Sequence, residues 1–316
     1  MSGSDCFLGV DGGGTKTRFA FIDAEGRLLA EAQHGTTYHP QVGLDGVREI
    51  LHAGIDQVLL EAGVQIDTIR HAFFGLPAYG EDSDATAKLQ AIPRELLGHD
   101  RYACDNDMVC GWAGSLACAD GINIVAGTGS IGYGQRQGNA ARAGGWGEAF
   151  SDEGSAYWIA AQGLNIYSRM SDGRLPKGPL HAVFNEALGL GNDLDICARV
   201  YGEQALSRGD FAKLSLLVAK AAHLGDTNAM HIYTQAGDEL AQIADSLRRA
   251  LDFGADETIP LSYSGGVFSA GELLLTPFKE ALHRACPAFE LRSPIHEPHY
   301  GAALYAAKLS RRLGQT

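Results

Sequence analysis

The chain has 316 residues, 45% of them hydrophobic, and its 25 Lys and Arg residues against 38 Asp and Glu residues give a formal net charge of −13. This length predicts two domains. The acidic balance argues against nucleic acid and membrane surfaces as partners, because both are anionic. The sequence has no apolar run long enough to cross a membrane and no signal-peptide pattern at its start, so we expect a cytoplasmic protein.

The first third of the chain predicts alternating strands and helices. Strands are expected at 6–10, 17–23 and 28–33, and the turn between the first two contains three glycines, in a conformation that only glycine adopts freely. Hydrophobic residues on one face predict a helix from about Leu44 to Gly63. A strand, a short helix, a second strand and a second helix are expected next, at 71–77, 84–96, 101–105 and about 107–118.

The pattern restarts near residues 118–120. The segment INIVAGTGSIGYG repeats the order of the opening CFLGVDGGGTKTRFAF, a strand, a Gly-rich turn and a strand, which indicates an internal duplication at domain scale. The second half is expected to be mostly helical between about Glu153 and Phe253. A strand, IPLSYS, then leads into two glycines, and a last helix is expected at about 301–313, with basic residues at its end as the helix dipole favours.

The motif DGGGTKT predicts a phosphate-binding loop. Glycines after a strand let successive backbone N–H groups approach an anion, and the following residues add hydroxyl and cationic donors. The candidates are Gly12, Gly13, Gly14, Thr15, Lys16 and Thr17. Asp11 is placed to hold Mg²⁺ through water. The motif is neither a P-loop nor a Rossmann fingerprint, because it leads into a strand. The alternative is an ordinary glycine-rich hairpin turn.

A second loop repeats this pattern in the other half of the chain. Its candidate residues are Gly127, Thr128, Gly129 and Ser130, which lie between two expected strands. One such loop is weak evidence. Two of them, at the starts of two similar halves, predict that a triphosphate is gripped from both sides of a cleft.

Asp107, in YACDNDMV, stands where a strand is expected to meet a helix. A carboxylate there can accept the proton of a hydroxyl that attacks phosphorus, although positioning provides most of the catalysis in phosphoryl transfer. The alternative is helix capping, which is common for aspartate at a helix start. Asp105 is a rival for the catalytic role.

Two further glycine-containing segments suit organic ligands. In GGWGEAFSDEGSAYWIA, Trp146 offers a flat apolar face for a sugar ring, and Asp152 and Glu153 can accept hydrogen bonds from hydroxyls; the alternative is a capped helix with a packed Trp. In SGGVF, Gly265 and Gly266 let the backbone pass close to a planar ligand such as adenine, although such a turn is common.

Together these motifs resemble the N-acetylglucosamine kinase group of the BadF/BadG/BcrA/BcrD ATPase family, in the actin, Hsp70 and hexokinase-like superfamily. The resemblance extends from Leu8 to about Leu313, and DEGSAYWIA is its most specific part. It implies an α/β protein with two ribonuclease-H-like (actin-like ATPase) domains, at 1–118 and 119–299, with a ligand cleft between them. The second domain would carry a helical insertion, and a helix over about 300–314 would pack back on the first.

The resemblance also implies residue roles. Asp107 matches the catalytic aspartate better than Asp105, and Gly265 and Gly266 match the adenosine motif. The residues expected to contact the sugar are Tyr38, His39, Asn106, Asp107, Gly145, Trp146 and Asp152. The sequence departs from the family pattern in two places. Thr-Tyr-His-Pro, with Tyr38 and Pro40, replaces a loop that often has Asn before its His, near the sugar's 2-substituent. Ser151 replaces the usual Gly.

The implied activity is transfer of the γ-phosphoryl group of ATP, with Mg²⁺, to the 6-hydroxyl of an amino sugar, with N-acetylglucosamine as the expected substrate. A kinase of glucosamine or another hexose stays open because of Tyr38 and Pro40. An ATPase that activates an acyl-CoA dehydratase or reductase is a further alternative, against which the lack of a matching cysteine set counts. The expected partners are the sugar and ATP, with a possible homodimer.

Overall fold

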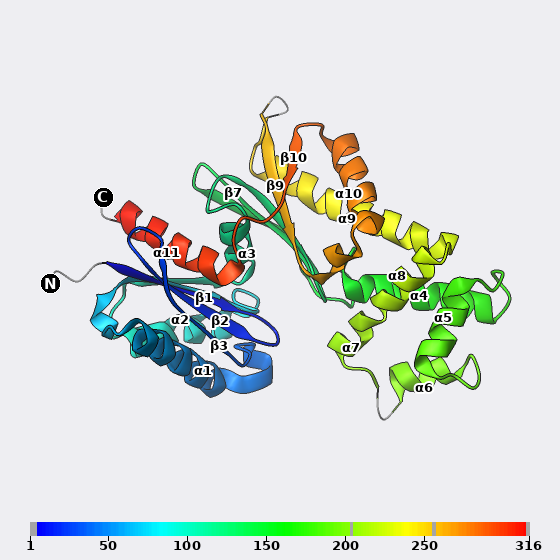
Figure 1. The fold of residues 1–316 in the computed structure, drawn as a ribbon, viewed down its shortest axis with the longest axis horizontal. Helices are drawn as coiled ribbons and strands as arrows, with labels where there is room; N and C mark the ends of the chain where they lie inside the picture. The colour runs from blue at the N-terminus through cyan, green and yellow to red at the C-terminus, as the bar shows by residue number, and fades with distance from the viewer. Residues whose placement is uncertain (1–4, 203–204, 255–256, 314–316) are drawn as a thin grey trace. The chain divides into compact units, whose positions relative to one another are not determined.

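The computed structural model describes residues 5–202, 205–254 and 257–313 (Figure 1). The chain divides into two compact units. Unit 1 comprises Met1–Asp120 and Ser293–Thr316, and unit 2 comprises Gly121–Arg292. Unit 2 is therefore inserted into unit 1, and residues 293–299, which we expected in the second domain, group with the first.

Unit 1 is built on a mixed five-stranded sheet in the order β3-β2-β1-β4-β5. Its strands are β1 (Cys6–Gly12), β2 (Thr17–Asp23), β3 (Leu28–His34), β4 (Ile69–Leu76) and β5 (Tyr102–Asn106). β1, β2 and β3 form an antiparallel meander, whereas β4 and β5 run parallel to β1. Because β1, β4 and β5 are parallel, Asp11, Gly75 and Asp105 lie in one row across the sheet, near the carboxyl ends of the three strands.

Helices cover this sheet: α1 (His39–Ala62), the 3₁₀ turn η1 (Ile66–Thr68), α2 (Ser83–Leu97), α3 (Met108–Ser115) and α11 (Pro298–Leu313). The helix expected from about Leu44 is present, and α1 has one further turn before it. This turn begins at His39, where Pro40 suits a first helical turn, and Gly43, with φ 70° and ψ 172°, separates it from the rest. Residue 314, the expected end of the last helix, lies outside the described residues.

The last helix belongs to the first unit. α11, red in Figure 1, lies beside β1, the dark blue strand, and it also packs on α3. The approach is close: a Cβ added to Gly9 would lie 2.1 Å from the backbone N of Ala303, and one added to Gly301 would lie 2.0 Å from the backbone N of Gly114. α11 therefore supports the strand that carries Asp11 and the helix that follows Asp107.

Unit 2 repeats the topology of unit 1. Its sheet has the order β10-β9-β6-β7-β8, with β6 (Gly121–Ala126), β7 (Ser130–Arg136), β8 (Asn139–Gly144), β9 (Ile259–Ser264) and β10 (Phe289–Arg292). β6, β7 and β8 form an antiparallel meander, and β9 and β10 extend the sheet in parallel with β6. The expected internal duplication and the two α/β sheets are confirmed. β8 and β10 were not anticipated from the sequence.

The helical region expected between about Glu153 and Phe253 is present. Its elements are α4 (Ala156–Ser171), α5 (Pro179–Leu188), α6 (Asp195–Tyr201), α7 (Arg208–Lys213), α8 (Ser215–His223) and α9 (Thr227–Ala250). After β9 follow the 3₁₀ turn η2 (Gly266–Ala270) and α10 (Glu272–Ala285), and α10 lies beside α9 (Figure 1).

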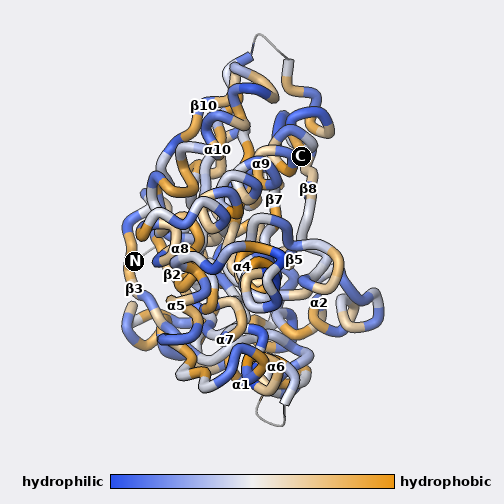
Figure 2. Tube along the Cα trace, turned by 90° about the vertical axis from the view of Figure 1, so that its right-hand side faces the viewer, coloured by the Kyte–Doolittle hydropathy of each residue, from blue (hydrophilic) through white to orange (hydrophobic). Residues whose placement is uncertain are grey.

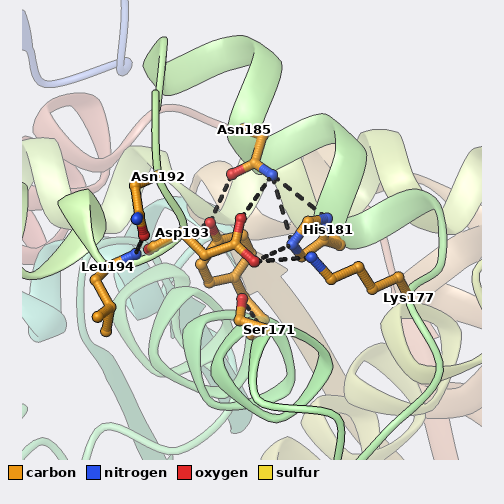
Figure 3. Close-up of polar contacts among 8 residues, drawn as sticks. Ser171, Lys177, His181, Asn185, Asn192, Asp193 and Leu194 are labelled. Carbon is orange, nitrogen blue, oxygen red and sulfur yellow. Dashed lines mark hydrogen bonds and ion pairs between the residues drawn. The ribbon is translucent and has the colours of Figure 1, made fainter.

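A polar network fixes the connection from α5 to α6 (Figure 3). Asp193 accepts hydrogen bonds from Lys177 (2.9 Å), His181 (2.8 Å) and Asn185 (3.2 Å). The ring of His181 also stacks on that of Tyr167, with centroids 5.1 Å apart. The His181 and Lys177 hydrogen bonds hold the pKa of Asp193 well below its ordinary value. The network thus anchors the chain segment that leads to α6 and α7.

Within the described ranges, no helix combines the length and apolar character that a membrane span requires. In Figure 2 the trace changes between hydrophobic and hydrophilic residues within the labelled helices. This alternation is typical of helices that bury one face in a protein core.

Candidate active site

Asp11 lies at the end of β1, half-buried, and it is paired in register with Arg18 of β2. Burial raises the pKa of this carboxyl from 3.8 to about 6, against the lowering effects of Cys110 and Arg18. The Asp11 side chain is therefore an oxygen donor at the mouth of the loop that we expected to bind phosphate.

The 12–17 loop is a tight hairpin in which the Gly13 N–H donates to the Lys16 carbonyl at 2.9 Å. The expected glycine-only conformation was wrong, because none of the three glycines takes a positive φ. Close approach is the reason for glycine at Gly12, where a Cβ would lie 2.3 Å from Oγ1 of Thr37. Thr15 and Lys16 are exposed, whereas Thr17 is fully buried and its hydroxyl donates to Thr37 at 3.1 Å.

The segment before α1 is tied to this loop. The Thr36 hydroxyl donates to the Gly13 carbonyl at 2.7 Å and accepts from the Tyr38 N–H at 3.0 Å. The structure thus brings Tyr38 and His39, expected to contact the sugar, next to the residues expected to contact phosphate. Nδ1 of His39 is buried and has no hydrogen-bond partner.

Asp107 stands at the N-terminus of α3, but its carboxylate makes no capping hydrogen bond. Asn106 provides that bond instead, since its Oδ1 accepts from the Met108 N–H at 3.2 Å. The rival Asp105 has Oδ1 occupied by the Asn106 N–H at 2.7 Å. By this geometry Asp107 is not the side-chain cap of α3, although the nearby N–H groups of Met108 and of Asp107 itself lower the pKa of its carboxyl.

Burial and the negative charge of Asp11 raise the pKa of Asp107 from 3.8 to about 7. Gly75 makes this proximity possible. A Cβ at Gly75 would lie 2.2 Å from Sγ of Cys110 and 3.2 Å from Cα of Asp107, so only glycine lets the start of α3 lie against β4. Two carboxyls with raised pKa values near each other are typical of a functional site.

In unit 2, the 127–130 loop is bonded to the start of α4. The carbonyls of Gly127 and Thr128 accept from the N–H groups of Ala156 (2.9 Å) and Tyr157 (3.3 Å). The buried hydroxyl of Ser130 donates to the Glu153 carbonyl at 2.7 Å. These bonds unite the second expected phosphate loop and the DEGS segment in one rigid substructure.

Asp152 is 3% exposed and lies against that loop: a Cβ at Gly129 would be 2.5 Å from its Oδ2. Its backbone φ is 60°, a left-handed conformation that costs a non-glycine residue about 1–2 kcal/mol and that clusters at functional sites. Burial raises the pKa of Asp152, while the positive charge of Arg208 opposes that rise.

Trp146 projects from the glycine-rich turn and is 71% exposed. Gly145 and Gly147 flank it with φ values of 70° and 100°, in the left-handed region that favours glycine. The Arg142 guanidinium lies 5.8 Å from the Trp146 ring centre. An exposed aromatic face on a constrained turn is suited to stack on a sugar ring.

Gly265 lies next to the same loop. A Cβ added to it would be 2.4 Å from the carbonyl oxygen of Ala126, which directly precedes Gly127. Gly266 begins the 3₁₀ turn η2. The expected adenosine motif and the second expected phosphate loop are therefore neighbours within unit 2.

Sequence reasoning missed several contributing residues, namely Thr36, Thr37, Gly75, Cys110, Glu148 and Arg208. Arg208 bonds Asp152 from 56 positions away, and Thr36 reaches Gly13 across 23 positions. The single chain carries no local pattern for such pairs. Thr36 and Thr37 could have been found from the sequence, because they directly precede the unusual Tyr-His-Pro segment.

The donor set suits Mg²⁺ better than a metal bound by several side chains. In the part of the chain that the structure describes, no group of three or more His, Cys, Asp or Glu side chains could hold an ion. Mg²⁺ needs only one or two carboxylates, since it keeps several waters and binds the oxygens of substrate phosphates. Asp11, a partly buried carboxyl beside the 12–17 loop, fits this requirement.

Comparisons with known proteins place these motifs in context. A model of the BadF/BadG/BcrA/BcrD ATPase family matches residues 8–306. The chain is 29% identical over 312 residues to an N-acetyl-D-glucosamine kinase of Dictyostelium discoideum, covering 96% of this chain and 98% of that protein. It is 25% identical over 300 residues to an N-acetylmuramic acid/N-acetylglucosamine kinase of Clostridium acetobutylicum, covering 95% and 97%.

A solved structure has a similar fold over the whole chain. It is that of a Chromobacterium violaceum protein provisionally named an N-acetylglucosamine kinase, with a TM-score of 0.75 and 26% identity over 96% of this chain and 99% of that one. The expected family resemblance and the actin-like α/β fold are confirmed.

Proposed function

The chain belongs to the BadF/BadG/BcrA/BcrD ATPase family, and we propose that it is an ATP-dependent amino sugar kinase that phosphorylates the 6-hydroxyl of N-acetylglucosamine. The observation that carries this proposal is the state of Asp107. Its carboxylate stands at a helix start without capping it, beside Asp11, and its pKa is raised to about 7. Such a group is suited to accept a proton near neutral pH.

Asp107 acts as the general base of the proposed reaction. The 6-hydroxyl oxygen of the sugar forms a bond to the γ-phosphorus while the bond from that phosphorus to the ADP oxygen breaks, and Asp107 takes the hydroxyl proton. General-base help contributes about 10²–10⁴-fold to such reactions, and positioning contributes much of the rest. Asn106 supports Asp107 by satisfying the helix terminus in its place.

The amides of Gly12 to Gly14, with Thr15 and Lys16, would bind phosphate oxygens from unit 1. Thr17 would serve indirectly, because its buried hydroxyl holds Thr37. Asp11 would hold Mg²⁺ largely through water, and the bound ion would neutralise charge on the phosphates. Tyr38 and His39 would face the sugar, because the Thr36 bonds hold their segment beside the 12–17 loop.

Unit 2 supplies the remaining contacts of the proposal. Residues 127–130 bind phosphate, and Gly265 and Gly266 lie against the adenosine. Trp146, on its Gly145 turn, stacks on the sugar, and Asp152 accepts hydrogen bonds from sugar hydroxyls. The bonds that link residues 127–130 to α4 support this assignment, because they keep the phosphate and sugar contacts in a fixed relation.

Glucosamine or another hexose is the second candidate for the substrate. Tyr38, which is 38% exposed, and Pro40 replace the residues usually found near the sugar's 2-substituent. A larger side chain at this place changes the space for an acetamide group. The family resemblance favours N-acetylglucosamine, so glucosamine ranks second. A homodimer in the cytoplasm completes the proposal, and light scattering of the purified protein tests the dimer.

A coupled assay of ADP release with Mg-ATP tests the function. Wild type is given N-acetylglucosamine, glucosamine, glucose or no sugar, and release that depends on N-acetylglucosamine is the expected result. Asp107→Asn should fold normally and lose about 10²–10⁴-fold in turnover. Asp105→Asn is the matched control, and a larger loss there would move the base to Asp105. Steady ATP hydrolysis at a rate that no sugar changes would contradict the kinase assignment and favour an ATPase activator.

A further inference from the structure

Arg208 is a charged residue that lies against both motifs of unit 2 and has no role in the function proposed above. It is the first residue of α7. Its Nε lies 2.7 Å from Oε2 of Glu148, and its Nη2 lies 3.1 Å from Oδ2 of Asp152. One guanidinium group therefore bridges two carboxylates of the GGWGEAFSDEG segment.

The Asp152 carboxylate depends on such a cation. Its side chain is only 4% exposed, and a buried carboxylate is costly unless it is paired and hydrogen-bonded. Its Oδ1 accepts a hydrogen bond of 3.4 Å from the Gly147 N–H, which is long and weak. The Ser130 backbone N–H also bonds this carboxylate. The contact with Arg208 is charge-assisted and shorter than the Gly147 bond, so it constrains the direction of the carboxylate more strongly than that bond does.

The packing of α7 on α4 fixes the position of Arg208. The ring of Phe211 stacks on Tyr157 of α4, with centroids 4.3 Å apart and an interplanar angle of 27°. Ser207 caps the helix by accepting from the Asp210 N–H at 3.1 Å. Tyr157 in turn donates its N–H to Thr128 of the 127–130 loop. Arg208 therefore comes from an element that is packed on the same substructure as the loop.

The contact also reaches the expected phosphate loop. A Cβ added to Gly129 would lie 2.5 Å from Oδ2 of Asp152 and 3.1 Å from Nη2 of Arg208. The guanidinium and the carboxylate therefore occupy the space beside Gly129 that a side chain there would need.

We propose that Arg208 is a positioning residue that fixes the Asp152 carboxylate in the orientation in which it accepts hydrogen bonds from the sugar, with Glu148 as the second anchor of the guanidinium. This inference rests on the proposed function. Arg208 acts through Asp152 and does not touch the sugar itself. Arginine suits this role because its planar fork reaches two carboxylates at once, which a lysine ammonium does not do in a fixed geometry.

Steady-state kinetics and calorimetric sugar binding test the inference. Arg208→Gln is expected to raise the sugar KM and Kd at least about tenfold, while the ATP KM changes less than about threefold. Arg208→Lys should recover part of the loss, because it restores the charge without the fork. Lys213→Gln is the matched control, since Lys213 lies on the same helix and pairs with Asp210. It should leave both KM values unchanged.

A double-mutant cycle with Asp152→Asn separates positioning from general support of the fold. If Arg208 acts through Asp152, then Arg208→Gln added to Asp152→Asn should change the sugar Kd by less than about twofold. Equal effects of Arg208→Gln in both backgrounds would overturn the inference, as would a wild-type sugar KM in Arg208→Gln. Should Arg208→Gln fail to fold, Arg208→Lys decides in its place, and an unchanged sugar KM overturns the inference. A wild type that binds no sugar overturns the proposed function and this inference with it.

Discussion

Asp107 stands at a helix start without serving as its cap, and this is the residue that best links sequence to function. Aspartate at a helix start usually accepts bonds from the first-turn amides. Here the neighbouring Asn106 takes that role. In the proposed reaction, Asn106 would therefore support the helix start while the adjacent Asp107 takes the proton.

Keeping such a carboxyl partly buried beside Asp11 has a cost in stability that depends on pH. The folded chain holds the Asp107 proton up to about pH 7, whereas the ordinary value is 3.8. Between these values the folded state binds more protons than the unfolded state, so the free energy of unfolding falls as pH rises through this window. At pH 8 the full cost is present.

Asp107→Asn should therefore be more stable than wild type at pH 8, by about 1–2 kcal/mol, because the amide has no charge to bury. The difference in melting temperature should shrink toward zero as pH falls to about 4. Thermal unfolding of both proteins from pH 4 to pH 8 measures this. Asp67→Asn, at an exposed position of η1, is the control for the loss of a carboxylate and should change stability little at any of these pH values. A constant difference for Asp107→Asn would contradict the expected pKa.

Residue types could be predicted at this scale, but their partners could not. Local sequence patterns identified the glycines, Asp11, Asp107 and Trp146 as candidate site residues. The Thr36 to Gly13 bond joins residues far apart in the sequence, so a single chain gives no sign of it. The reason for Gly12 was also misjudged, because it is close packing against Thr37 and not backbone conformation.

At the scale of helices and strands, the close approach of α3 to β4 brings the Asp107 carboxyl near that of Asp11. β4 contributes Gly75, which lies in register between Asp11 of β1 and Asp105 of β5. Its missing side chain leaves the space that Cys110 and the start of α3 occupy. A buried glycine in a strand otherwise weakens it, so a packing reason is the expected explanation.

Gly75→Ala should push α3 away from β4, because the new Cβ would lie 2.2 Å from Sγ of Cys110. We expect a loss of about 1–3 kcal/mol in the free energy of unfolding and at least about tenfold lower turnover, as Asp107 is displaced. Chemical denaturation and the ADP assay measure the two effects. Cys110→Ala added to Gly75→Ala should restore much of both, since it removes the colliding sulfur.

Gly35→Ala is the control for this pair. It lies in the same unit, and a Cβ there would meet only Cδ1 of Ile50 at an ordinary 3.6 Å. It should leave turnover and stability nearly unchanged. If Gly75→Ala behaved like Gly35→Ala, the glycine would have no part in placing Asp107.

Elements with strong periodicity were predictable, and those without it were not. The apolar strands and the long helices had clear patterns. β8 has the sequence NAARAG, which lacks β-branched and aromatic residues, and β10 is four residues long and partly exposed. Both strands form because a sheet edge is available, which is tertiary information. The extra turn at the start of α1 was not predicted, because the non-helical Gly43 separates it from the periodic part of the helix.

At the scale of the whole chain, duplication and insertion explain why the motifs recur. The strand orders β3-β2-β1-β4-β5 and β8-β7-β6-β9-β10 are the same arrangement. In each unit a glycine-containing turn joins the two strands that come first along the chain, β1 to β2 and β6 to β7. The repeat was visible in the sequence. The return of the chain to unit 1 was inferred only from the family resemblance, because no local pattern says where the last helix packs.

α11 is the part of unit 1 that the chain supplies last, and unit 1 should not form a native core without it. It buries Ala302, Ala303 and Ala306 against β1 and α3. A chain that ends at Arg292 leaves that apolar surface of the sheet exposed to water, which is unfavourable by roughly 25 cal/mol per Å². Unit 2, Gly121–Arg292, is continuous in sequence and has its own hydrophobic core.

Hydrogen exchange should therefore show lost protection in β1 and β4 of the chain ending at Arg292, while β6 and α9 keep theirs. A chain that ends at Leu313 is the control and should exchange like the full protein. Adding residues 293–313 as a separate peptide should restore part of the protection in β1, because the helix packs on the strand without any need for a covalent link. Full protection of β1 in the truncated chain would mean that the sheet of unit 1 is stable alone, and α11 would then be a cover and not a part of its core.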